Sequence, residues 1–237
     1  MFRFETLLRF PRLYATFALR SKSPNFEKVL YLREIKRGHT VFDLGANIGY
    51  YSFLFSKLVG KCGSVFAFEP VPITFQKLTQ NTKKCRNLIL HNFAVGNSRR
   101  EGEVCYDLED LGKSSLLSKA TNNVRAAKTQ IVPLDEYCKV NNLERLDFVK
   151  CDVEGYELQV MQGMVETLTK FLPKISIEIT LPDKERLALI ELLREIGYDV
   201  FRRIECGYPL VHPDEDLCSD DFVYLHALSS KFSPSSS

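Results

Sequence analysis

An acid, two glycines and an asparagine interrupt the apolar stretch VFDLGANIGYYSF, residues 41–53. Gly45 and Gly49 allow a tight turn and a close approach of a ligand to the backbone, and Asn47 tolerates a positive φ better than most residues. Such a turn opens a helix whose free N–H groups can face a polar ligand. An ordinary strand-to-helix turn also favours glycine, so this pattern alone is a weak indication of a binding site.

Two acidic residues beside this turn indicate which ligand it holds. Glu69 ends the next apolar stretch, 20 residues after Gly49, where nucleotide-binding units place an acid on ribose hydroxyls. Asp43 precedes the glycines, and its charge would repel a pyrophosphate but attract the cationic end of S-adenosylmethionine. The dinucleotide pattern G-x-G-x-x-G is absent. The residues therefore favour S-adenosylmethionine and methyl transfer over a nicotinamide cofactor and hydride transfer.

Further polar residues follow later strands, at the sheet edge where open parallel sheets bind ligands. Asn92 and Phe93 can hydrogen-bond to and stack on an adenine, although Phe93 fits the core equally well. Asp152 and Glu154 lie close together at one strand end, and we interpret them as part of a binding site. Glu157 falls in the first turn of the following helix, where a carboxylate stabilises the helix dipole, and we interpret it as structural. We expect the cofactor to contact Asp43, Gly45, Asn47, Gly49, Glu69, Pro70, Asn92, Phe93 and Asp152.

Methyl transfer to an alcohol oxygen needs an aligned donor and acceptor, and it benefits from a general base. The candidates for this base are Asp152, Glu154, Glu178 and His226. A lone histidine is more often structural, so His226 is a weaker candidate. Asp152 and Glu154 would also suit a divalent cation, but we predict no metal site.

Composition restricts the class of protein. The chain has 237 residues, of which 45% are hydrophobic, and this suits one α/β domain. A formal net charge of +2 predicts no strong attraction to nucleic acid, and the [DN]-P-P-[FYW] motif of adenine amino-methylation is absent. No apolar run reaches the roughly 20 residues that a membrane-spanning helix needs. The seven cysteines form no C-x-x-C pair, so we expect reduced thiols in a cytoplasmic protein.

Strands and helices alternate from residue 40 onwards, which predicts a mainly parallel sheet covered on both faces. One segment, 146–168, combines a strand, a polar turn and a helix, and residues 98–133 form a strand-bearing insertion that a helix near Leu134 closes. The last two strands have no helix between them, which predicts an antiparallel pair. The other expected strands are 40–46, 64–70, 88–95, 173–180, 199–206 and 221–228.

Six motifs, in order, make the chain resemble the FkbM family of S-adenosylmethionine-dependent methyltransferases: FDLGANIGYYS, FEPVPITFQKLTQN, NFAVGN, KSSLL, VPLDEY and LDFVKCDVEGYELQVMQG. The resemblance covers residues 38–180 and implies a Rossmann-like class I methyltransferase fold with a seven-stranded sheet. It implies methylation of a hydroxyl on a small molecule, sugar or lipid. The resemblance also implies which residues form the cofactor site. Asn92 and Asp152 would lie near the adenine and methionine ends of S-adenosylmethionine, and the remaining residues would line the cofactor: Asp43, Gly45, Asn47, Gly49 and Glu69.

The resemblance and the residues together predict three segments. Residues 1–40 form a basic, amphipathic helical cap that is a candidate for peripheral membrane contact, residues 41–228 the methyltransferase domain, and residues 229–237 a disordered tail. Two alternatives stay open: a regulatory protein that binds S-adenosylmethionine without turnover, and a nicotinamide-dependent oxidoreductase. The acceptor and the oligomeric state are not predicted.

Overall fold

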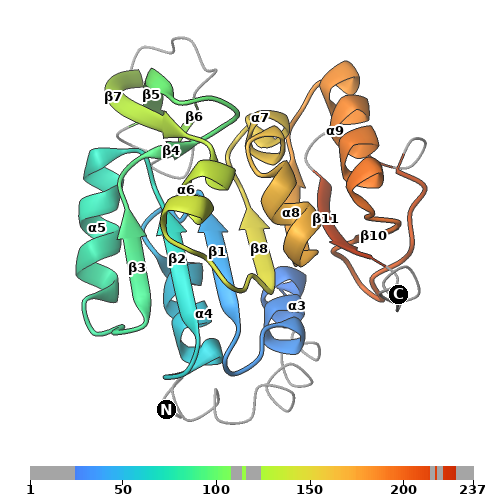
Figure 1. Ribbon diagram of the computed structural model, residues 1–237, viewed down its shortest axis with the longest axis horizontal. Helices are drawn as coiled ribbons and strands as arrows, with labels where there is room; N and C mark the ends of the chain where they lie inside the picture. The colour runs from blue at the N-terminus through green and yellow to red at the C-terminus, as the bar shows by residue number, and fades with distance from the viewer. Residues whose placement is uncertain (1–24, 108–113, 116–123, 214–216, 218–220, 228–237) are drawn as a thin grey trace.

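The computed structural model describes residues 25–107, 114–115, 124–213, 217 and 221–227. Within them, seven strands form a main sheet: β1 (Thr40–Leu44), β2 (Ser64–Phe68), β3 (Leu88–His91), β8 (Phe148–Cys151), β9 (Lys174–Ile179), β10 (Val200–Arg203) and β11 (Asp221–His226). Their spatial order is β10, β11, β9, β8, β1, β2, β3 (Figure 1).

β11 runs antiparallel to both of its neighbours, whereas the other neighbouring strands of this sheet are parallel. The predicted, mainly parallel seven-stranded sheet with an antiparallel pair at the end of the chain is therefore confirmed. From β1 the chain builds outwards to β2 and β3, and it then returns to the other side of β1 to form β8 and β9. The order thus reverses between β1 and β8, and open α/β sheets bind ligands beside such a reversal.

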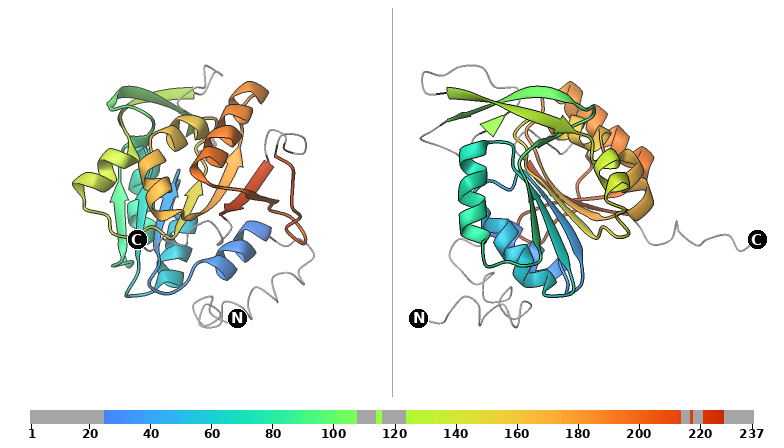
Figure 2. Two further views of the ribbon diagram at one scale, coloured as in Figure 1. Left: turned by 45° about the vertical axis from the view of Figure 1, so that its right-hand side comes forward. Right: turned by 60° about the vertical axis from the view of Figure 1, so that its left-hand side comes forward.

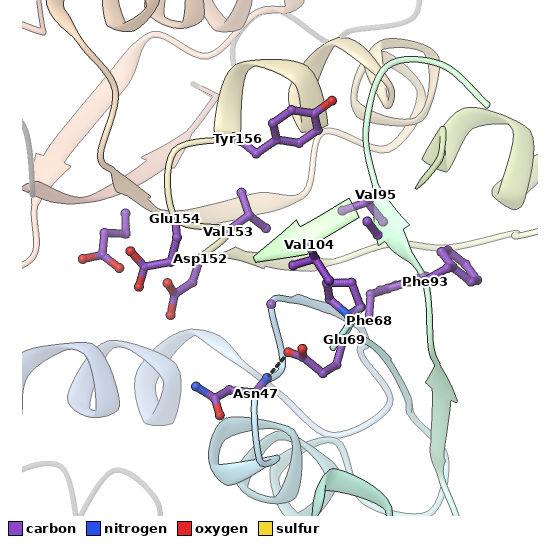
Figure 3. A pocket seen from close by; sticks show the side chains of 14 residues that line it. Asn47, Phe68, Glu69, Phe93, Val95, Val104, Asp152, Val153, Glu154 and Tyr156 are labelled. Carbon is purple, nitrogen blue, oxygen red and sulfur yellow. Dashed lines mark hydrogen bonds between the residues drawn. The ribbon is translucent and has the colours of Figure 1, made fainter. Parts of the chain in front are cut away.

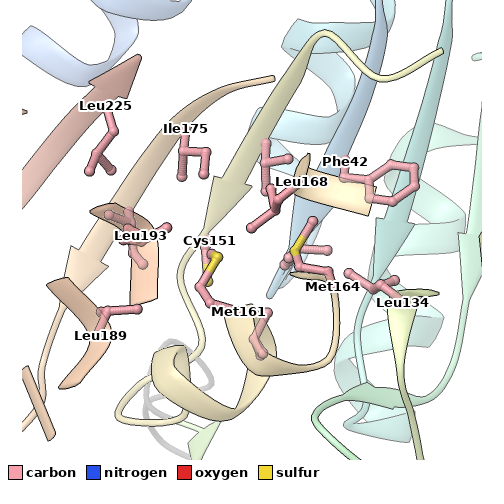
Figure 4. Close-up of a cluster of buried hydrophobic side chains, with 14 of the residues drawn as sticks. Phe42, Leu134, Cys151, Met161, Met164, Leu168, Ile175, Leu189, Leu193 and Leu225 are labelled. Atoms are coloured by element: carbon pink, nitrogen blue, oxygen red, sulfur yellow. The ribbon is translucent and has the colours of Figure 1, made fainter. Parts of the chain in front are cut away.

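Helices cover both faces of the main sheet (Figure 2). One face carries α3 (Phe26–Glu34), α4 (Tyr50–Val59) and α5 (Pro72–Thr82), and the other α6 (Leu134–Val140), α7 (Glu157–Gln162), α8 (Val165–Phe171) and α9 (Asp183–Ile196). Strand side chains alternate between the faces, so Val41 packs with α3 and α4 while Phe42 joins the larger cluster on the opposite face. Figure 4 shows that larger cluster, where Met161, Met164 and Leu168 meet the strands.

A second, four-stranded sheet lies across the carboxyl ends of the main strands (Figures 1 and 2). Its strands, in spatial order, are β4 (Ala94–Val95), β7 (Val124–Val132), β5 (Arg100–Asp107) and β6 (Ser114–Ser115). The predicted strand-bearing insertion at 98–133 supplies three of these four strands. β4 comes from the predicted strand 88–95, which the structure divides, because residues 92 and 93 belong to neither β3 nor β4.

The helix expected after the motif DVEG is divided as well. α7 ends at Gln162 and α8 begins at Val165. Gly163 lies between them against the backbone of Gly96, and a Cβ on Gly163 would lie 1.9 Å from the carbonyl oxygen of Gly96. The close approach of these two chain segments accounts for the break, which the helical spacing of the sequence does not indicate.

The predicted cap at 1–40 is described from residue 25 onwards, where α3 packs on the sheet through buried residues such as Leu30 and Tyr31. The first 24 residues of this segment, which is a candidate for peripheral membrane contact, and the predicted tail at 229–237 lie outside the described residues. In the described part of the chain, no helix has the length and apolar character to cross a membrane.

Candidate active site

The carboxyl ends of β1, β2, β8 and β9 surround a pocket below the second sheet (Figure 3). It contains about 710 Å³ of space, including the part open to solvent. Its lining consists of Gly45, Asn47, Phe68, Glu69, Pro70, Phe93, Ala94, Val95, Val104, Asp152, Val153, Glu154, Tyr156 and Glu178. The pocket therefore brings together most of the residues that we expected at a cofactor site.

The turn between β1 and α4 reaches the pocket because its backbone is left-handed at three positions. The φ angles are 76° at Gly45, 50° at Asn47 and 88° at Gly49. A Cβ on Gly45 would lie 1.8 Å from the carbonyl oxygen of Asp152, so this position requires glycine. Gly45 and Asn47 line the pocket, whereas Gly49 is the N-cap of α4 and lies against Leu78 behind the turn.

Glu69 follows β2 and is held against this turn. Its carboxylate accepts hydrogen bonds from the backbone N–H groups of Asn47 and Val71, both at 2.9 Å. Burial raises the pKa of Glu69 to about 7, although the two backbone donors oppose this shift. Each carboxylate oxygen has more than one lone pair, so Glu69 retains the capacity to accept hydrogen bonds from hydroxyl groups in the pocket.

Asp43 lies beneath the pocket and does not line it. Its side chain is fully buried; Oδ2 accepts a hydrogen bond from Ser52, and Oδ1 has no hydrogen-bond partner. Burial raises the pKa of Asp43, against the opposing effect of Lys150, which is its partner in the β1–β8 register. Asp43 therefore does not reach the pocket surface, and we do not retain it as a direct cofactor contact.

Pro70 and Phe93 line an apolar side of the pocket together with Phe68. The ring centroids of Phe68 and Phe93 are 5.5 Å apart. Asn92 is exposed and lies outside the lining, because its Nδ2 donates to the carbonyl oxygens of Glu69 (2.8 Å) and Pro70 (3.2 Å). Asn92 thus fixes the ends of two strands, whereas the apolar side offers a surface for an aromatic base.

Lys150 is a buried cation that the sequence reasoning did not select. Its side chain is 3% exposed, and Nζ donates to Oδ2 of Asp152 at 2.6 Å. Burial alone lowers the pKa of Lys150, but Asp152 and Asp43 outweigh burial and hold the pKa above its ordinary value. The spacing of two between Lys150 and Asp152 was a usable signal, since such residues lie on the same side of a strand.

Three of the four predicted candidates for the general base meet in this pocket. Asp152, Glu154 and Glu178 each present a carboxylate oxygen within 4.8 Å of the others. Burial raises the pKa of Glu178 to about 8, and the hydrogen bond and charge of Asp152 add to this effect. Burial also acts to raise the pKa of Asp152, but Lys150 and the hydrogen bond with Glu178 lower it overall. Near neutral pH, Asp152 is therefore ionised and Glu178 holds a proton.

The same three carboxyl groups have the spacing of a possible cation site. The Lys150 ammonium and the proton between Asp152 and Glu178 already compensate negative charge here. For this reason we keep the expectation that no metal ion is needed, as a prediction.

His226, the fourth candidate, is not brought to this pocket. It lines a different cavity together with Lys174, the first residue of β9. Glu178 is four residues further along this strand, a distance of roughly 13 Å at the usual rise per residue. We therefore do not retain His226 as a base.

Tyr156 and Val104 are lining residues that the sequence reasoning missed. The Tyr156 hydroxyl accepts a hydrogen bond from Arg100 Nη2 at 2.8 Å, which joins β5 to the segment after β8. Tyr156 lies in one of the motifs that carry the family resemblance, but no sequence pattern marks its contact with Arg100, because that contact depends on how the second sheet folds over the first.

Known proteins resemble this chain in sequence and in fold. The hexuronic acid methyltransferase AglP of Haloferax volcanii is 30% identical over 139 residues, which are 59% of this chain and 55% of AglP. The 31-O-demethyl-FK506 methyltransferase FkbM of Streptomyces tacrolimicus is 24% identical over 204 residues, covering 72% of this chain and 77% of that protein. The chain thus matches about half the length of AglP.

A crystal structure of methyltransferase FkbM from Methylobacillus flagellatus matches the fold with a TM-score of 0.52 and 18% identity, over 93% of this chain and 60% of that one. The strand order described above and this match establish the α/β, Rossmann-like class I methyltransferase fold. The methyltransferase FkbM domain matches residues 43–200, which is more than half of the sequence. This chain therefore belongs to the family of methyltransferase FkbM domains.

Proposed function

We propose that this chain transfers a methyl group from S-adenosylmethionine to a hydroxyl oxygen of a small molecule, a sugar or a lipid-linked acceptor. The family supports methyl transfer. The relative named for a 31-O-demethyl compound supports an oxygen acceptor, and the relative named for a hexuronic acid supports a sugar acid as the acceptor. The observation that carries the proposal is one pocket with a hydroxyl-accepting carboxylate, Glu69, on one side and a carboxyl cluster on the other.

The carboxylates and the apolar side of the pocket fit this cofactor. Glu69 is positioned to accept the ribose hydroxyls, and the apolar side formed by Phe68, Pro70 and Phe93 suits adenine. Asp152, ionised beside Lys150, is suited to the cationic methionine end. When bound, S-adenosylmethionine supplies an electrophilic methyl group on a sulfonium.

Glu178 is the general base of this proposal. An ionised Glu178 accepts the proton of the acceptor hydroxyl while the oxygen bonds to the methyl carbon and the carbon–sulfur bond breaks. A pKa of about 8 makes its carboxylate a stronger base than that of Asp152, whose pKa is lowered, and bases with a pKa near the working pH are the most effective. Asp152 and Glu154 position this group, and the apolar residues Val95, Val104 and Val153 restrict water.

The cellular location of the protein and the class of its acceptor are part of the same proposal. We infer a cytoplasmic location, because the described cysteines, among them Cys62, Cys138 and Cys151, are free thiols, as in reducing compartments. A nearly balanced charge favours an acceptor other than nucleic acid.

Ligand-induced thermal shifts test the cofactor. We expect S-adenosylmethionine and S-adenosylhomocysteine to raise the melting temperature of the wild type and of Glu195→Ala, which changes an exposed acid on α9. Glu69→Ala should reduce this shift strongly, because it removes the buried acceptor for ribose. A shift with NADH and none with S-adenosylmethionine would instead support the oxidoreductase.

A labelled methyl donor tests turnover. Incubation with sugars, glycolipids and hydroxylated natural products should move the label to an acceptor in the wild type, and Glu178→Gln should slow transfer by at least about 100-fold. Cofactor binding without label transfer across such a panel would favour the regulatory alternative.

A further inference from the structure

A second cavity lies at the opposite end of β9 from the candidate active site. It contains about 760 Å³ of space, including the part open to solvent. α3, β10 and β11, which contribute to its wall, lie together at the lower right of Figure 1. Its lining residues are Leu30, Arg33, Glu34, Lys174, Arg202, Gly207, Tyr208, Tyr224 and His226. The proposed methyl transfer uses none of them.

Cations outnumber carboxylates in this lining. Arg33, Lys174 and Arg202 come from three different elements, and among the lining residues that the structure describes Glu34 is the one carboxylate. Glu34 is already engaged, because Lys174 Nζ lies 2.5 Å from its Oε2 and the Tyr224 hydroxyl also hydrogen-bonds to it. The cavity therefore retains an excess of positive charge that a mobile anion can neutralise.

Tyr208 contacts both guanidinium groups. Its backbone is left-handed, with φ of 48°, directly after Gly207 with φ of 84°, a conformation that a bulky residue adopts only when its surroundings enforce it. The Tyr208 hydroxyl donates to the carbonyl oxygen of Phe26 at 2.8 Å, and its own carbonyl accepts from Arg202 Nη1 at 3.0 Å. Its ring centroid lies 5.7 Å from the guanidinium carbon of Arg33. Tyr208 therefore links the two arginines on one side of the cavity.

We propose that this cavity is a binding site for a phosphate group that carries two negative charges, held by Arg33 and Arg202 with Lys174. Guanidinium groups match phosphate oxygens in paired hydrogen bonds. Cations on three sides suit a tetrahedral anion better than a planar carboxylate, which presents only two oxygens. The Tyr224 ring and His226 close one side with their ring centroids 5.6 Å apart. A soluble phosphate ester and a phospholipid headgroup share this chemistry.

Calorimetric titration with inorganic phosphate, in a phosphate-free buffer of constant ionic strength, tests the site. We expect the wild type to bind phosphate and each of Arg33→Gln and Arg202→Gln to weaken binding by about tenfold or more, because each removes a charged hydrogen-bond donor. Arg86→Gln, which neutralises an exposed arginine outside this cavity, is the matched control and should bind like the wild type. Arg33 is exposed on α3, so Arg33→Gln keeps the test valid if Arg202→Gln does not fold.

Vesicles distinguish the source of the phosphate. The same proteins are sedimented with phosphatidylcholine vesicles that contain or lack phosphatidic acid. Phosphate binding that depends on the two arginines supports a soluble ester, and arginine-dependent binding to phosphatidic acid alone supports a headgroup. Absence of binding to both probes, or equal binding by the wild type and both variants, would overturn the proposal.

Discussion

The affinity for S-adenosylmethionine should depend on pH through one carboxyl group, Glu178. In the free protein this group has a pKa of about 8 and shares a proton with Asp152. The cofactor brings positive charge next to it, so binding favours the ionised form and releases the proton. We therefore predict that affinity rises as pH increases, and that Glu178→Gln removes this rise because glutamine mimics the protonated acid.

The size of the effect follows from Coulomb's law. A cation about 6 Å from the carboxylate, at an effective dielectric constant of about 20, interacts with it by about 3 kcal/mol, or roughly two pKa units. The pKa of Glu178 would fall from about 8 to about 6 on binding. Below about pH 6 both states are protonated, and above about pH 8 both are ionised, so affinity increases by about 100-fold between these limits.

Isothermal titration calorimetry from about pH 5.5 to about pH 9 measures this dependence. Buffers of different ionisation enthalpy report the released proton directly. S-adenosylhomocysteine lacks the sulfonium charge and should show a weaker rise. Glu69 also has a raised pKa, of about 7, so any dependence that persists in Glu178→Gln is assigned to Glu69 and tested with Glu69→Gln. Glu195→Gln, at an exposed position on α9, controls for the loss of one carboxylate.

Two results would refute this reasoning. One is a pH profile in Glu178→Gln that equals the profile of the wild type. The other is a wild-type affinity that falls between about pH 6 and pH 8, since the linkage of a raised carboxyl pKa to a cationic ligand allows only the opposite sign.

Two predictions concern the structure that supports the site. Gly38→Ala should lower the free energy of unfolding by about 1–2 kcal/mol and Gly45→Ala by clearly more: both positions have positive φ, but only at Gly45 does a Cβ meet backbone. Equal losses in urea unfolding would contradict this. Lys150→Met should lower the free energy of unfolding by about 3–5 kcal/mol near pH 8, because Asp43 and Asp152 lose their buried counter-charge. The loss should be smaller near pH 5, because the substitution raises the pKa values of these two carboxyl groups, and a raised carboxyl pKa in the folded state favours folding at low pH. A loss that does not change with pH in the same measurement would argue against this charge arrangement.

The sequence was most informative where chemistry depends on neighbours along the chain. The turn from Gly45 to Gly49 and the acid Glu69 follow successive strands, and parallel strands bring their carboxyl ends to one edge. The strand order therefore placed Gly45, Asn47 and Glu69 around one pocket, as expected. The same argument brought Asp152 and Glu178 together from β8 and β9.

Residue order along the chain was less informative about how deeply a side chain is buried and how far it lies from the candidate active site. Asp43 precedes the cofactor turn, yet it points below the pocket towards Ser52 and Lys150. His226 ends a strand near the others in the sheet, but β11 runs antiparallel, so its last residue lies at the far edge. The direction of one strand thus separated His226 from the active site.

What the sequence by itself determined is the fold class and the sheet edge that carries the candidate site, because both follow from local alternation of strands and helices and from the residues at strand ends. What only the tertiary structure decided is the protonation of that edge and the cavity at its opposite end. The raised pKa of Glu178 depends on burial and on Asp152 from another strand, and the basic cavity joins α3 to β9, β10 and β11. These properties arise from through-space distances between segments far apart in the chain, and electrostatic energy depends on those distances and on the exclusion of water.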